Sequence, residues 1–175
     1  MPDLKHEISQ IIRDIPDFPK QGVIFKDITP LLRHPEAFKK VIDWMIEPHL
    51  NKGIDIIVGV ESRGFMFASP AAYKLGAGVV PVRKPGKLPW KTLEASYQLE
   101  YGVDRLQIHQ DAITPGQKVL ILDDVLATGG TAEATSSLIK KLGGEIVEAC
   151  FLIELSFLKG RDKLPGVPVR SLLQF

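Results

Sequence analysis

The stretch Val119-Leu-Ile-Leu-Asp-Asp-Val-Leu-Ala-Thr-Gly-Gly-Thr131 decides the fold that we expect for this chain. Residues 119–122 are all apolar and predict a buried strand, and the acid pair Asp123 and Asp124 stands where that strand should end. A turn of small residues then leads directly into a helix predicted over 131–142. A strand, a polar turn and a helix in this order predict one βα unit of a parallel sheet, with the polar residues at its carboxyl edge.

The same pattern recurs on both sides of this unit. Mainly apolar runs, which contain only Asp55 and Glu148 as charged residues, predict strands over 54–60, 79–82 and 146–153, and a helix is predicted over 62–75. Because strands of this kind are apolar on both faces, helices must cover both faces of their sheet. We therefore expect an α/β fold with a mainly parallel central sheet flanked by helices, in a single domain over residues 1–175.

The remaining segments are less regular. Apolar residues at helical spacing predict an amphipathic helix in the first dozen residues and another that begins at His34-Pro35. Polar and apolar residues alternate between 85 and 110, which predicts a ribbon laid over the end of the sheet. The tail, 165–175, ends in apolar residues, and we expect it to pack back onto the body of the protein.

The composition excludes several classes of protein. Lys and Arg total 22 against 21 for Asp and Glu, so the net charge of +1 argues against a polybasic nucleic-acid-binding surface. The one cysteine, Cys150, cannot form an internal disulfide, and the four scattered histidines lack metal-ligand spacing and are expected at the surface. The apolar runs are too short to span a bilayer. We therefore expect a cytoplasmic protein that binds neither nucleic acid nor a membrane.

The turn after the acid pair is typical of a phosphate site. A helix N-terminus offers unpaired N–H groups, glycines let the backbone approach an anion, and threonine hydroxyls add donors. The predicted phosphate-binding residues are Ala127, Thr128, Gly129, Gly130 and Thr131. The acids would repel a phosphate and instead suit sugar hydroxyls or a divalent metal. Two simpler interpretations stay open at this point: the glycines form only a turn, or the acids only cap the helix.

This stretch resembles the 5-phospho-α-D-ribose 1-diphosphate (PRPP) binding signature of the type I phosphoribosyltransferases. Further motifs follow in the same order as in the adenine-specific branch of that family: Phe18-Pro19, Gly22-Val-Ile-Phe-Lys-Asp-Ile28, Glu61-Ser-Arg-Gly-Phe65, Arg83-Lys-Pro-Gly-Lys-Leu-Pro89 and Ser96-Tyr-Gln-Leu-Glu-Tyr-Gly102. The resemblance covers nearly the whole chain. It implies the type I phosphoribosyltransferase fold, with a small N-terminal hood over residues 1–34 and a flexible lid loop near 84–101.

The resemblance also implies a reaction and its partners. Adenine would displace diphosphate from PRPP to give AMP in purine salvage, with Mg²⁺ carried by PRPP and a homodimer as the usual assembly. Two alternatives remain: the base is guanine or hypoxanthine, or the protein is a non-catalytic regulator that binds PRPP.

The roles of the family's residues are carried over to the matching positions. Asp123 and Asp124 resemble the ribose-hydroxyl ligands, and Glu100 resembles the catalytic acid/base residue, with Tyr101 beside it in the lid. Arg63 is implied both in catalysis and in binding of the leaving group. The implied diphosphate-binding residues are Glu61, Ser62, Arg63, Arg83, Lys84 and Lys87, and the implied adenine-binding residues are Ile24, Phe25 and Lys26. The bond between residues 61 and 62 is often cis in the family, and we expect a cis bond here.

Overall fold

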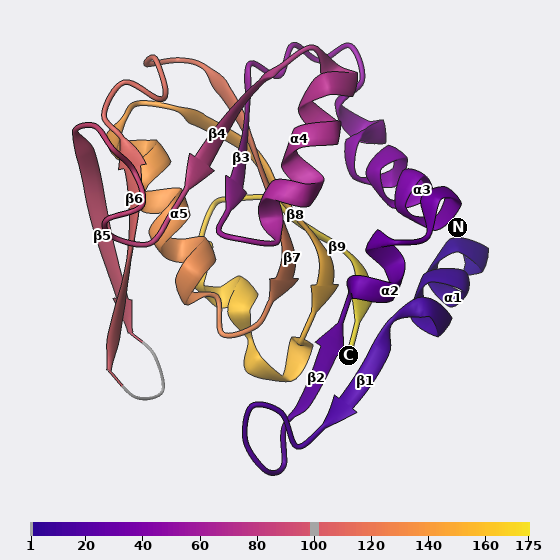
Figure 1. The fold of residues 1–175 in the computed structure, drawn as a ribbon. Helices are drawn as coiled ribbons and strands as arrows, with labels where there is room; N and C mark the ends of the chain where they lie inside the picture. The colour runs from indigo at the N-terminus through magenta and orange to yellow at the C-terminus, as the bar shows by residue number, and fades with distance from the viewer. Residues whose placement is uncertain (1, 99–101) are drawn as a thin grey trace. The chain divides into compact units, whose positions relative to one another are not determined.

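The apolar strands form a five-stranded sheet in which all neighbouring strands run parallel (Figure 1). The structure, a computed structural model, describes residues 2–98 and 102–175. In spatial order the strands are β4 (Gly78–Val82), β3 (Ile56–Val60), β7 (Lys118–Leu126), β8 (Glu145–Glu154) and β9 (Val169–Gln174). The predicted α/β fold with a parallel central sheet is confirmed.

Helices cover this sheet on both faces (Figure 1). Helix α4 (Gly64–Leu75) packs closely on β3, since a Cβ atom added at Gly59 would lie only 2.8 Å from the Cβ of Ala68. Side chains alternate along a strand, so Val58 points to the opposite face. There it belongs to the core that includes residues of helix α5 (Gly130–Lys141).

The hairpin of β5 (Thr92–Gln98) and β6 (Val103–His109) lies on the α5 side of the sheet (Figure 1). Tyr97, Leu106 and Ile108 are buried in the core that the hairpin shares with α5 and the sheet. Alternate side chains along each strand therefore face this core, which explains the alternating sequence pattern. The ribbon predicted from this pattern is present as the hairpin, which packs against α5 and the sheet.

The chain divides into two compact units, residues 1–44 and 45–175. The first unit contains α1 (Pro2–Ile11), the antiparallel pair β1 (Arg13–Pro16) and β2 (Ile24–Asp27), α2 (Thr29–Leu32) and most of α3 (Pro35–Ile46). The second contains the sheet and three short 3₁₀ turns, η1 (Glu47–His49), η2 (Ser156–Leu158) and η3 (Gly160–Lys163). Within the described residues, no helix combines the length and apolar character needed to cross a membrane. The single-domain assignment and the hood over 1–34 stay predictions.

Two expectations about particular residues are wrong. Strand β7 does not end before the acid pair but continues to Leu126, because it stays paired with β8 as far as Glu154. His49 is buried rather than exposed. Its ring can be buried because Nε2 has a polar partner, Oε2 of Glu148, at 2.9 Å. The tail does pack back onto the body, and it does so as β9, a full strand of the sheet.

Candidate active site

The sheet has a switch point between β3 and β7. From β3 the chain passes through α4 to β4 on one side, and it later returns to β7 on the other side of β3. The two strands are parallel and pair as far as Gly59 and Leu122, so the turn at 61–63 and the segment from 123 onward emerge at the same edge. Ligands of open α/β sheets bind at such a point, beyond the carboxyl ends of the strands.

At this edge the acid pair meets the turn that follows β3. Nε of Arg63 lies 2.7 Å from Oδ2 of Asp124, whose side chain is 7% exposed. The backbone N–H of Asp124 donates to Oδ1 of Asp123 at 2.9 Å. A Cβ atom at Gly64 would lie 2.8 Å from Oδ1 of Asp123, so only glycine lets the start of α4 approach the acids this closely. The structure thus brings three residues predicted for the site into one cluster.

Burial gives this acid pair unusual protonation behaviour. Burial, and then the neighbouring charge of Asp124, hold the pKa of Asp123 well above its ordinary value. Burial also raises the pKa of Asp124, and the Arg63 guanidinium opposes that effect. Carboxyl groups with displaced pKa values in a cleft are typical of functional sites.

The predicted phosphate-binding residues form one small hollow after β7. It is lined by Asp123, Val125, Leu126, Phe151, Ala132 and the loop 127–131. Gly129 has a φ of +81°, a conformation that favours glycine, and it directly precedes the first residue of α5. The N-terminus of α5 therefore opens onto this hollow with its unpaired N–H groups. A Cβ atom at Gly130 would lie 2.6 Å from Cδ2 of Tyr97, so the hairpin packs directly on this loop.

Glu61 holds the predicted cationic segment in place. Its Oε2 accepts a hydrogen bond from the backbone N–H of Lys84 at 2.9 Å and lies 3.2 Å from Nε of Arg83. These donors hold the pKa of the Glu61 carboxyl below its ordinary value, the Lys84 N–H having the largest effect. The peptide bond between Glu61 and the exposed Ser62 is cis, as expected. Sequence reasoning placed Glu61 among the diphosphate ligands and missed its contacts with the cations.

A second set of contacts links the cationic segment to the hairpin. Nζ of Lys84 lies 3.0 Å from Oδ2 of Asp104, and the same oxygen accepts a hydrogen bond from the Tyr97 hydroxyl at 3.1 Å. Arg83 stands over the ring of Phe65, 5.8 Å from its centroid, whereas Lys87 is exposed. Asp104 and Tyr97 were not assigned a role from sequence, because no spacing rule connects them to Lys84.

The predicted adenine-binding residues lie on β2, in the first unit. The Phe25 ring is half-buried and meets the edge of Phe18 with ring centroids 5.2 Å apart. Nζ of Lys26 lies 2.7 Å from Oδ1 of Asp14, opposite it on β1, while Ile24 is 56% exposed. The peptide bond between Phe18 and Pro19 is cis. Strand β2 thus presents an aromatic ring and an exposed aliphatic side chain in consecutive positions.

Comparison with known proteins identifies the family. The model of the phosphoribosyl transferase domain matches residues 27–165. The chain belongs to the phosphoribosyltransferase family. The adenine phosphoribosyltransferase of Thermotoga sp. (strain RQ2) is 59% identical over 169 residues, which cover 97% of this chain and 99% of that protein. This phosphoribosyltransferase is therefore similar to its relatives over nearly its full length.

Solved structures agree with the sequence relatives. The crystal structure of adenine phosphoribosyltransferase from Rhodothermus marinus has a TM-score of 0.95 at 53% identity and covers 100% of both chains. The enzyme from Saccharomyces cerevisiae, crystallised with adenine and an imino-altritol bisphosphate, has a TM-score of 0.92 at 43% identity and covers 98% of this chain and 99% of that one. The fold of this phosphoribosyltransferase is that of the type I members, as predicted.

Two residues implied by the family resemblance, Glu100 and Tyr101, lie outside the described residues. Their roles stay predictions, as does the lid loop that would carry them. The structure brings together Arg63 and the acid pair, and it places Glu61 against Arg83 and Lys84.

Proposed function

We propose that this phosphoribosyltransferase transfers the phosphoribosyl group of PRPP to N9 of adenine, giving AMP and diphosphate in purine salvage. The observation that carries the proposal is the 59% identity over 97% of the chain to a relative named adenine phosphoribosyltransferase. The adenine bound in the yeast enzyme's crystal structure supports the same base.

The loop 127–131 binds the 5′-phosphate. Its support is the hollow lined by these residues at the N-terminus of α5, where free N–H groups and the helix dipole favour an anion. The hydroxyls of Thr128 and Thr131 add donors for the same group. Fixing this end of PRPP places the anomeric carbon near the acid pair and lowers the entropic part of the barrier.

Asp123 and Asp124 bind the ribose hydroxyls. Their negative charge also stabilises the positive charge that develops on the ribose as the bond to diphosphate breaks. Arg63 holds Asp124 in position through its 2.7 Å contact. As diphosphate leaves, its charge is met by Arg63, Arg83, Lys84 and Lys87, since guanidinium groups match phosphate oxygens in pairs.

We include Mg²⁺ in the proposal as an ion carried by PRPP. Among residues 2–98 and 102–175, no group of three His, Cys, Asp or Glu side chains could hold a metal ion. Hard oxygen donors suit Mg²⁺, so Asp123 and Asp124 fit it as additional partners beside PRPP and water. When bound, Mg²⁺ supplies neutralisation of charge on the leaving diphosphate.

Adenine is recognised by β2. Phe25 stacks on the purine ring, and backbone groups of Ile24 and Lys26 read its amino edge. Backbone groups that match one pattern of donors and acceptors reject a base with another pattern, because a buried polar group would lose its partner. An oxo-purine such as hypoxanthine would place a carbonyl against a carbonyl at this edge.

The experiment is a measurement of diphosphate release with PRPP, Mg²⁺ and each of adenine, guanine, hypoxanthine and xanthine in turn. We expect release with adenine and little with the others. Faster release with an oxo-purine would overturn the choice of base. A folded protein that binds PRPP but does not release diphosphate with any of the four bases would instead be the non-catalytic regulator.

The same proposal includes a homodimer in the cytoplasm. Met66 is 47% exposed and Tyr73 is 90% exposed, and they lie seven residues apart on α4, on one face of that helix. Val79 is 43% exposed on β4, one of the two edge strands of the sheet. Exposed apolar residues of this size favour an interface, and light scattering after gel filtration measures the mass.

The single free cysteine suits a reducing compartment.

A further inference from the structure

The phosphate loop contacts the segment that follows β8. A Cβ atom at Gly160 would lie 2.3 Å from the backbone oxygen of Ala127 and 3.1 Å from the backbone nitrogen of Gly129. Conversely, a Cβ atom at Gly129 would lie 2.4 Å from the backbone oxygen of Gly160. The two backbones therefore touch without side chains between them, which only glycine allows at both positions.

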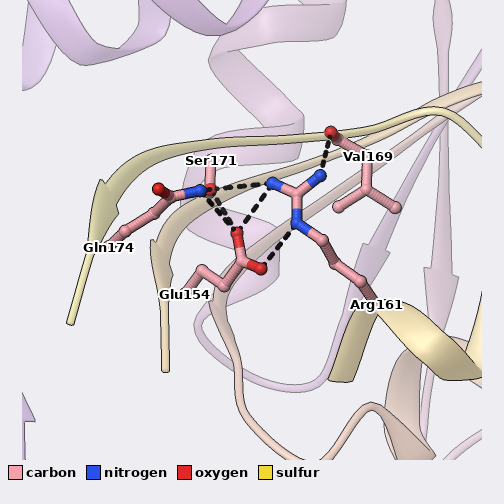
Figure 2. Close-up of polar contacts among 5 residues, drawn as sticks. All are labelled: Glu154, Arg161, Val169, Ser171 and Gln174. Carbon is pink, nitrogen blue, oxygen red and sulfur yellow. Dashed lines mark hydrogen bonds and ion pairs between the residues drawn. The ribbon is translucent and has the colours of Figure 1, made fainter. Parts of the chain in front are cut away.

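Gly160 is followed by an anchored arginine. Nε and Nη2 of Arg161 donate to the two carboxylate oxygens of Glu154 at 2.6 and 2.7 Å, and Nη1 donates to the backbone oxygen of Val169 at 2.8 Å (Figure 2). The Glu154 side chain is 5% exposed, although 40% of the Arg161 side chain remains exposed. A bidentate pair of this kind fixes both position and orientation of the guanidinium.

The Glu154 carboxylate has further partners on β9. The Ser171 hydroxyl donates to its Oε2 at 2.5 Å, and Nε2 of Gln174 donates to the same oxygen at 3.2 Å (Figure 2). Every donor needed to keep this buried charge satisfied is thus supplied by η3 and β9. Removing one partner of such a group is costly, so the network holds η3 rigidly on the sheet.

Glu154 also stands beside the start of the loop. It is the last residue of β8 and pairs with Leu126, the last residue of β7. The next backbone N–H, that of Leu155, donates to the backbone oxygen of Leu126 at 2.9 Å. The network therefore reaches the loop by two routes, through the sheet at Leu126 and through Gly160 at Ala127 and Gly129.

We propose that Gly160, Arg161 and Glu154 are positioning residues for the phosphate loop, holding its backbone so that its N–H groups stay aimed at the 5′-phosphate. The proposal rests on the proposed function, because it takes loop 127–131 as the 5′-phosphate site. The three residues act through Leu126, Ala127 and Gly129, and none of the three lines the hollow at the loop. Their loss should therefore weaken binding of the ribose phosphate while leaving binding of adenine unchanged.

The first test is Gly160→Ala against the control Gly78→Ala. The control adds the same methyl group on β4, where it meets the end of the Ile56 side chain at 3.0 Å and the backbone oxygen of Asp55 at an ordinary 3.6 Å. With ribose 5-phosphate as the probe in calorimetry, we expect Gly160→Ala to raise its Kd at least tenfold. Gly78→Ala should change it less than twofold, and the Kd of adenine should stay the same in both.

The second test separates positioning from stability, and it also serves if Gly160→Ala does not fold. Arg161→Met is compared with Arg170→Met, because each arginine pairs with a glutamate of β8. Arg170, on β9, lies 3.1 Å from Glu148. Both variants should lower the Tm. Only Arg161→Met should raise the Kd of ribose 5-phosphate and the KM of PRPP, with little change in kcat. Equal losses in the two variants, or no loss in either, would overturn the proposal.

Thr128→Val shows which assignment fails, if one does. Its hydroxyl belongs to the loop itself, and the substitution keeps the side-chain volume. If the wild-type protein does not bind ribose 5-phosphate, or if Thr128→Val binds it as tightly as the wild-type protein does, the phosphate site of the proposed function is wrong. If Thr128→Val weakens binding while Gly160→Ala and Arg161→Met do not, the loop assignment stands and the positioning role is refuted.

Discussion

Nε of Arg63 lies 2.7 Å from Oδ2 of Asp124, although the two residues are far apart in the sequence. Arg63 follows β3 and Asp124 lies inside β7, so the contact joins the two strands on either side of the switch point. One residue of the pair is predicted to bind the leaving group and the other the ribose. In the proposed function, this contact would couple the leaving-group and ribose parts of the PRPP site.

Replacing Arg63 by methionine should impair both stability and catalysis. The buried Asp124 would lose its cation, at a cost of about 1–3 kcal/mol in the free energy of unfolding. Loss of the guanidinium should also lower kcat/KM by roughly 10²–10³-fold, the usual effect of removing one charge-stabilising donor. Thermal melts and steady-state kinetics measure the two effects.

Arg105→Met is the matched control, because Arg105 pairs with Glu94 at 3.4 Å while 61% and 37% of the two side chains are exposed. Exposed pairs contribute little, so this variant should behave like the wild-type protein. If Arg63→Met bound PRPP and turned over normally, the role given to Arg63 would be wrong.

Asp123→Asn should stabilise the free protein and inactivate it. The folded-state pKa of Asp123 is raised, chiefly by burial, so its ionisation at neutral pH opposes folding. Removing the charge should raise the free energy of unfolding by about 1 kcal/mol, which raises the Tm by roughly 2–4 °C. The difference in stability between Asp123→Asn and the wild-type protein should shrink as the pH falls through the folded-state pKa of Asp123, because the wild-type carboxyl is then protonated and uncharged.

Melting curves from neutral to acid pH, together with kcat, check this prediction. A lower Tm for Asp123→Asn at neutral pH, or a difference that grows toward acid pH, would contradict the assigned protonation behaviour.

The elements that sequence predicted well are those formed by local patterns. Strands β3 and β8 lie in mainly apolar runs. Helix α4 ends at Gly76, which has a left-handed conformation. Such segments are buried wherever the sheet places them, so their identity depends little on distant residues.

The features that sequence missed depend on distant partners. The second half of β7 contains two acids, which favour a turn by local rules, and it is a strand only because β8 pairs with it. Glu61 meets Lys84 and His49 meets Glu148 through contacts between segments that no spacing rule connects. For the site, the residue types could therefore be predicted from motifs, whereas the pairs that hold them required the fold.

Glu100→Gln should lose turnover rather than substrate affinity. The family resemblance implies that Glu100 moves a proton at N7 of the purine, and an amide cannot do so. We expect kcat to fall by about 10²–10⁴-fold, with the Kd of PRPP unchanged. Glu94→Gln, on β5, is the control and should keep full activity. Equal losses of kcat and PRPP affinity in Glu100→Gln would place this residue in binding instead.

The thiol of Cys150 should be unreactive until the protein unfolds. Cys150 lies on β8 between Leu122 of β7 and Arg170 of β9, is 0% exposed, and burial raises its pKa to about 12. Only the thiolate is nucleophilic, so neither access nor ionisation favours reaction in the native state.

With a disulfide reagent such as dithionitrobenzoate, labelling should therefore proceed at the rate of unfolding, and added PRPP should slow it by stabilising the folded state. In strong denaturant the reagent should label one thiol per chain, since the sequence has one cysteine, and Cys150→Ala should give no signal. Fast labelling of the native protein would show instead that β8 opens locally between its two neighbours.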